Sequence, residues 1–111
     1  MRGYHESAAV GLTATGSTLG TALPLNARTN VVGTAAASTG VALPAGAAAG
    51  DLVFVTNNGA NALSVYPATA AGTINGGSAG AAVSLATTTY KTKNSLFLCT
   101  GTDTWIQFVG A

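Results

Sequence analysis

The stretch from Asp51 to Pro67 reads DLVFVTNNGANALSVYP, and it decides how the chain is expected to fold. Residues 52–55 are apolar at every position, so a strand formed by them is apolar on both faces. Such a strand is central in a sheet, or a partner covers one of its faces. Asn58 and Gly59 tolerate the positive φ of tight turns, so we predict a hairpin that returns through residues 61–66. Pro67 ends the returning strand because proline cannot donate to the ladder.

A second hairpin is predicted near the end of the sequence. Residues 95–100 (SLFLCT) and 104–109 (TWIQFV) are strand-like, and Gly-Thr-Asp at 101–103 provides the turn. Alternation places Trp105 on one face, with Ile106 and Phe108 on the other. We expect Trp105 to pack in the core, because large aromatic side chains dominate core burial.

The remaining sequence favours short strands and no helix. Weaker strand signals lie at 19–25, 29–34, 72–77 and 81–86, and the Ala-rich tract at 45–50 is too short and Gly-rich for a helix. Residues 1–17 have little to bury. We therefore predict an all-β protein: one small antiparallel β-sandwich or jelly-roll-like domain over residues 20–111, with an extended N-terminal arm over residues 1–19.

Charge and composition narrow the class of function. Charged residues make up 6% of the 111 residues and the net charge is +1, so the basic surface that nucleic acid requires is missing. Ala, Gly and Thr side chains give a thin core, and few charges keep copies of the chain apart. We therefore expect permanent assembly with other subunits.

A membrane span is not expected, although the chain carries no charge from Leu52 to Tyr90. Asn, Gly and Pro interrupt this region, so no window of about 20 continuous apolar residues exists. Cys99 is the only cysteine, which excludes an internal disulfide, and we expect it to be a buried small hydrophobe.

Residues with catalytic potential are few and scattered. His5 is the only histidine, and the carboxylates are Glu6, Asp51 and Asp103. General acid–base or metal chemistry needs such groups to converge, whereas these lie in a tail, at a strand edge and in a turn. We expect neither an enzyme nor a metal or cofactor, and Asp103 is interpreted as a turn residue.

Four short motifs follow one another over about residues 40–111: Gly40–Ala45 (GVALPA), Asp51–Pro67, Thr73–Gly76 (TING) and Cys99–Trp105 (CTGTDTW). In this order and spacing they resemble small virion proteins of tailed bacteriophages. The resemblance implies a β-sandwich virion component. Similar modules occur in capsid-decorating proteins and in tail or fibre proteins.

The first hypothesis is a capsid decoration (cement) protein that binds the outer surface of a phage head. It would stabilise the shell by bridging subunits of the major capsid protein, and the resemblance implies a homotrimer. It would be made in the host cytoplasm and reside on the virion. The alternative is a tail-fibre or receptor-binding module for a host surface glycan, which would need an exposed aromatic platform at Tyr66, Tyr90 or Trp105.

The N-terminal arm is the predicted contact with the capsid or a neighbouring subunit. It matches the phage proteins less clearly than the rest of the chain, as a segment that sets attachment specificity would. The candidate contact residues are Arg2, Tyr4, His5, Val10, Leu12 and Leu19.

Overall fold

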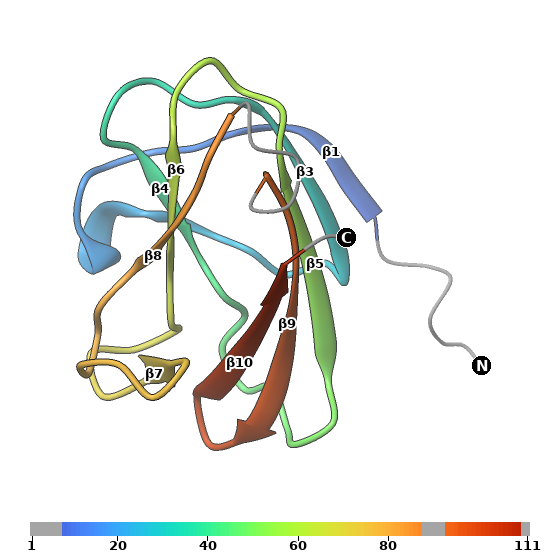
Figure 1. The fold of residues 1–111 in the computed structure, drawn as a ribbon, viewed down its shortest axis with the longest axis vertical. Helices are drawn as coiled ribbons and strands as arrows, with labels where there is room; N and C mark the ends of the chain where they lie inside the picture. Colours follow the sequence, from blue (N-terminus) through green and yellow to red (C-terminus); the bar gives the residue numbers. More distant parts are fainter. Residues whose placement is uncertain (1–7, 88–92, 110–111) are drawn as a thin grey trace.

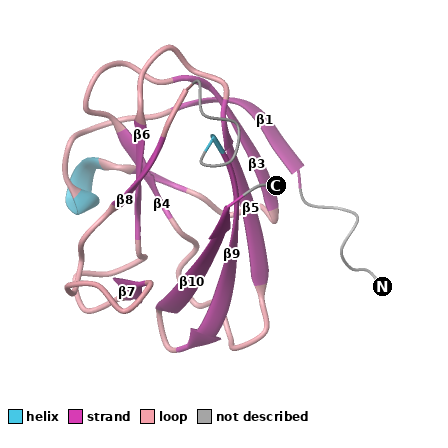
Figure 2. Ribbon diagram, viewed as in Figure 1, coloured by secondary structure: helices cyan, strands magenta, loops and turns pink. Residues whose placement is uncertain are grey.

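The chain is built almost entirely from strands in the computed structural model, which describes residues 8–87 and 93–109. The strands are β1 (Ala8–Thr13), β2 (Leu23–Pro24), β3 (Thr29–Thr34), β4 (Gly40–Ala42), β5 (Leu52–Asn57), β6 (Leu63–Tyr66), β7 (Thr73–Ile74), β8 (Val83–Leu85), β9 (Asn94–Gly101) and β10 (Thr104–Val109), and a single 3-10 turn, η1, covers Leu19–Thr21. Sheet A has the order β1-β3-β5-β9-β10-β7 and sheet B the order β2-β4-β6-β8 (Figures 1 and 2). The prediction of an all-β protein is confirmed.

Both sheets are mixed, because the chain changes sheet at every connection from β1 to β9. Two successive crossings return the chain to its sheet in the same direction at β3, β4, β5 and β6, but in the opposite direction at β8. Accordingly β1, β3 and β5 are parallel neighbours, and so are β2, β4 and β6. Antiparallel pairs occur only where β9 meets β5 and β10 and where β8 meets β6. The expected antiparallel architecture is therefore correct for only part of each sheet.

The predicted hairpin around Asn58-Gly59 is wrong. β5 lies between β3 and β9 in sheet A, whereas β6 lies between β4 and β8 in sheet B. The Asn/Gly segment carries the chain from one sheet to the other, as Figure 1 shows at the upper edge of the fold. The second predicted hairpin is confirmed, since β9 and β10 pair antiparallel. Ser95 lies opposite Val109 at one end of the pairing, and Gly101 lies opposite Thr104 at the other.

One hydrophobic core is shared by the two sheets. Sheet A contributes inward residues such as Val53, Phe97 and Trp105, and sheet B contributes Leu63 and Leu85. Trp105 is fully buried, as predicted, and its neighbours Ile106 and Phe108 point outward. Alternation along β10 thus places the largest side chain between the sheets.

The expected N-terminal arm differs from the structure over residues 8–19. β1 pairs with β3 at the edge of sheet A, Ala14 is buried, and Thr15 bridges to Gly40. The Tyr66 hydroxyl also donates to the Ser17 carbonyl at 3.0 Å. These residues can join the fold because the free edge of β3 accepts a parallel strand. Residues 1–7 lie outside the described part of the chain.

Candidate functional site

The predicted contact residues do not form one cluster in the described structure. Val10 is 72% exposed on β1, whereas Leu12 packs against the core and Leu19 is half-buried in η1. Arg2, Tyr4 and His5 lie outside the described residues. Within this set, Val10 alone is a large apolar side chain freely available to a partner.

The Asn/Gly segment is a structural corner. Asn57 is fully buried, and its amide nitrogen donates to the carbonyls of Asn61 (2.9 Å) and Leu85 (3.1 Å). Its Oδ1 accepts the Gly59 amide at 2.9 Å, so both polar atoms of the side chain are satisfied within the protein. Asn61 in turn donates to the Ala35 carbonyl at 2.9 Å. These groups hold the crossing between the sheets and are not directed at a ligand.

Asp103 is more than a turn residue. It adopts a left-handed conformation with φ 44°, and its carboxylate accepts hydrogen bonds from Ala68 N (2.9 Å), Thr69 N (2.7 Å), Thr69 Oγ1 (2.6 Å) and Trp105 Nε1 (2.9 Å). The carboxylate therefore ties the β9–β10 turn to the segment after β6. Gly72 is required beside it, because a Cβ there would collide with the carboxylate.

The pKa of Asp103 reflects two opposing effects. Partial burial raises it, because burial penalises the charged form, but hydrogen bonds from the side chains of Thr69 and Trp105 and from the backbone of Ala68 and Thr69 lower it. The hydrogen bonds prevail, so the pKa lies below the ordinary value. A carboxylate held in this way is ionised, satisfied and unsuited to proton transfer near neutral pH.

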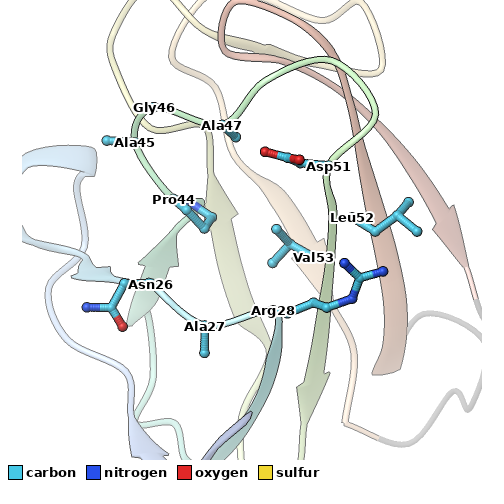
Figure 3. Close-up of a pocket in the computed structure, with 10 residues that line it drawn as sticks. All are labelled: Asn26, Ala27, Arg28, Pro44, Ala45, Gly46, Ala47, Asp51, Leu52 and Val53. Carbon is cyan, nitrogen blue, oxygen red and sulfur yellow. The ribbon is translucent and has the colours of Figure 1, made fainter. Parts of the chain in front are cut away.

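A surface pocket of about 280 Å³ has two charged residues, Arg28 and Asp51, in its lining (Figure 3). Their side chains do not converge: the Asp51 carboxylate turns toward Ala47, while Arg28 extends toward Leu52. Asp51 Oδ2 accepts the amide of Ala48 at 2.9 Å. The rest of the lining comprises Asn26 and apolar residues such as Pro44, Leu52 and Val53.

Reactive chemistry finds no other support in the described residues. Cys99 is buried, as predicted, and its thiol donates to the Gly101 carbonyl at 3.0 Å. Over residues 8–87 and 93–109, no three His, Cys, Asp or Glu side chains lie together as metal ligands. The same residues contain no helix that is long and apolar enough to cross a bilayer.

The outer side of sheet A carries the most distinctive surface, which we name the apolar face. It consists of Leu52, Phe54, Leu96, Leu98, Ile106 and Phe108. Cross-strand register arranges them in two rows, Leu52–Leu98–Ile106 and Phe54–Leu96–Phe108, across β5, β9 and β10. Phe54, Ile106 and Phe108 remain 40%, 38% and 50% exposed.

The apolar face is distinctive by comparison with the rest of the described surface. The exposed large hydrophobic residues are Val10, Phe54, Ile106, Phe108 and Val109. All five belong to strands of sheet A, and Val10 lies on β1 on the same outer side. A depression of about 270 Å³ lies beside Phe54, Leu96 and Phe108. Contiguous exposed apolar surface of this kind marks a site of interaction with another molecule.

The apolar face was missed as a site by the sequence reasoning, although its signal is present. Residues 52–55 are apolar on both strand faces, which indicates either a central strand or a covered face. Both alternatives hold, because β5 is central in sheet A and Phe54 is also exposed. Grouping Phe54 with Phe108 requires the pairing of β5 and β10 to β9, which one sequence does not provide.

Comparison of the chain with family models, with curated proteins and with solved structures found no match in any of the three. The description of the site therefore depends on the residues and geometry of this chain. On that basis the chain is a two-sheet β-protein whose connections are held by hydrogen bonds of Asn57 and Asp103 and which carries one exposed apolar face.

Proposed function

We propose that this protein is a structural component of a phage virion, a capsid decoration protein that binds the outer surface of the head. The observation that carries the proposal is the apolar face, because a chain that worked alone would gain solubility by covering or charging it. Its role would be mechanical: buried surface added across joints between subunits of the major capsid protein stabilises the shell.

The motifs of the phage resemblance are consistent with a shared module. Asn57 and Gly59 form the corner between the sheets, and Asp103 and Trp105 form the tie at the β9–β10 turn. The hydrogen bonds of these residues hold segments of the fold together, so their resemblance supports a common architecture of the sandwich-like kind. A non-enzymatic role fits the same observation, because the two described carboxylates are both held by backbone amides.

Attachment to the capsid is assigned to the N-terminal region, through Arg2, Tyr4 and His5 together with Val10. The exposed side chain of Val10 lies on the edge strand β1, where a capsid subunit could reach both the side chain and the free backbone edge. Leu12 contributes instead to the fold, because it packs against the core.

A glycan-binding tail module is the less favoured alternative. Trp105 is fully buried and cannot serve as a stacking platform, and the Tyr66 hydroxyl is engaged by the Ser17 carbonyl. Tyr90 lies outside the described residues. Phe54 and Phe108 are exposed, and the polar residues that line the depression beside them are Thr56, Asn94 and the buried Ser95.

The test is cryo-electron microscopy of phage particles assembled with and without the protein. Difference density over the head shell is the expected result, and density confined to the tail would overturn the proposal in favour of the alternative. A triple variant, Arg2→Ala, Tyr4→Ala and His5→Ala, should reduce head occupancy at least several-fold, because it removes charge and aromatic contacts. Ser84→Ala, on the exposed side of sheet B, is the matched control and should leave occupancy unchanged.

A further inference from the structure

The six residues of the apolar face are all uncharged, and Arg28 borders the face where it extends toward Leu52. The charged residues of the described chain are Arg28, Asp51, Lys93 and Asp103. None of them occupies an outward position on β5, β9 or β10, where Leu, Phe and Ile alternate with inward residues. A partner that placed a charge on this face would leave that charge desolvated and unpaired, which is strongly unfavourable.

Among the described residues, the only apolar patch large enough to cover the apolar face of one copy is the apolar face of another copy. Every exposed large hydrophobic residue among residues 8–87 and 93–109 lies on sheet A, and the strands of sheet B contribute none. A contact between two copies would therefore be isologous, with the same patch on both sides, which generates a two-fold dimer. Because the patch is uncharged, the two-fold operation places no like charges opposite one another.

The area is compatible with a reversible pair. Five strands, β1, β3, β5, β9 and β10, span about 24 Å at their usual spacing, and six-residue strands are about 20 Å long, which gives roughly 500 Å² per copy. Two copies would bury roughly 1,000 Å² in total, near the lower limit for a specific protein interface. The exposed Val10 and the half-buried Val31 extend the apolar surface across β1 and β3.

We infer that the apolar face binds the apolar face of a second copy of this chain, by stacking one sheet A on another. Facing sheets pack about 10 Å apart with interdigitated side chains, and the two rows of Leu, Phe and Ile supply such side chains. This inference rests on the proposed assembly role and assigns the partner of one surface. It also predicts a dimer through this surface, whereas the phage resemblance implies a trimer.

The experiment is sedimentation velocity of the full chain over a hundredfold range of concentration. The expected result is a monomer–dimer equilibrium in the micromolar range. Phe54→Lys and Phe108→Lys should each weaken dimerisation at least tenfold, because two ammonium groups would enter an apolar contact. Ser84→Lys adds the same charge on the outside of sheet B and should leave dimerisation unchanged.

Phe108→Thr, a β-branched replacement that suits a strand, is the second variant and should weaken the dimer even if a lysine variant fails to fold. A wild-type chain that stays monomeric throughout the concentration range, or that forms a trimer, would overturn the inference. Equal weakening by Ser84→Lys would do the same. If the protein decorates heads but stays monomeric, the dimer inference is wrong and the proposed function is supported. If the protein forms the dimer but never decorates heads, the dimer inference is supported and the proposed function is wrong.

Discussion

At the scale of single residues, the polar side chains of this protein mainly hold its connections in place. Asn57 joins the corner after β5 to β8 through the Leu85 carbonyl, and Asp103 joins the β9–β10 turn to Thr69. Each carries several hydrogen bonds from or to backbone groups that would otherwise be unsatisfied. Removing one such side chain therefore affects more than its own contact.

Replacement of Asp103 by Asn tests its role as a tie. The backbone should be preserved, because Asn also tolerates the left-handed conformation, but the amide nitrogen cannot accept the Thr69 amide. We expect a loss of about 1–3 kcal/mol in the free energy of unfolding at pH 7, the range for charged hydrogen bonds. Urea unfolding followed by Trp105 fluorescence measures it.

The pH dependence of stability provides the control for Asp103. Its pKa in the folded protein is below the ordinary value, so its contribution is present above about pH 4, the unfolded pKa of Asp, and is lost as pH falls through the folded pKa. The difference in stability between wild type and Asp103→Asn should therefore shrink below about pH 4. A difference that stays constant from pH 7 to pH 2 would contradict this account.

Gly59 is predicted to be indispensable at the corner between the sheets. A Cβ there would lie 2.5 Å from the Ala35 amide nitrogen, a backbone atom that cannot move aside as the end of a flexible side chain would. Gly59→Ala should cost about 1–3 kcal/mol through overpacking, which lowers the melting temperature by at least about 4 °C for a domain of this size. Gly20→Ala is the matched control, since its Cβ would meet nothing within 4 Å. Equal melting temperatures for the two variants would refute the prediction.

At the scale of elements, β1 is part of the domain and also its outermost six-residue strand. It pairs with β3 over Ala8–Thr13 and is followed by the buried Ala14. Its pairing is interrupted by register shifts after Ala9 and Leu12, and Gly11 adopts φ 66° between them. Irregularities of this kind blunt a free edge against uncontrolled pairing while leaving it open to a specific partner.

Two truncations separate the roles of the N-terminal region. Deletion of residues 1–7 leaves every described strand in place and should keep the melting temperature within about 2 °C, a change equivalent to less than 1 kcal/mol. Deletion of residues 1–19 removes β1, Ala14 and the acceptor of the Tyr66 hydroxyl, so we expect a loss of several kcal/mol or failure to fold. Thermal unfolding followed by circular dichroism distinguishes the two, and similar stability of both forms would show that β1 is dispensable.

At the scale of the whole molecule, the winding of the chain explains what one sequence can and cannot reveal. The positions of β3, β8 and the β9–β10 hairpin follow from local apolar alternation and turn residues, and the burial of Trp105 follows from its size. The sheet to which β6 belongs depends on Asn57 reaching Leu85, 28 residues away. Asn and Gly residues occur both in hairpin turns within one sheet and in connections between two sheets. The local sequence therefore predicts that the chain turns, but not which sheet the next strand joins.

The apolar face shows the same limit for the candidate site. The alternation of TWIQFV and the two-sided apolarity of DLVFV are visible in the sequence, but the two rows exist only because β9 separates β5 from β10. A surface that places Phe54 beside Leu96, 42 residues later in the sequence, is a property of the topology. Composition alone, with 6% charged residues, already favours assembly but does not locate the interface.

The row that contains Phe54 and Phe108 has a practical consequence for handling this protein. It continues through Thr29 to Ala8, so the first described residue and one of the last lie at the same level on opposite sides of the face. At the usual strand spacing they are about 20 Å apart. A bulky group attached directly at Ala8 or at Phe108 would thus lie beside the same surface and shield it sterically from a neighbour. Cleavable tags would keep that surface free.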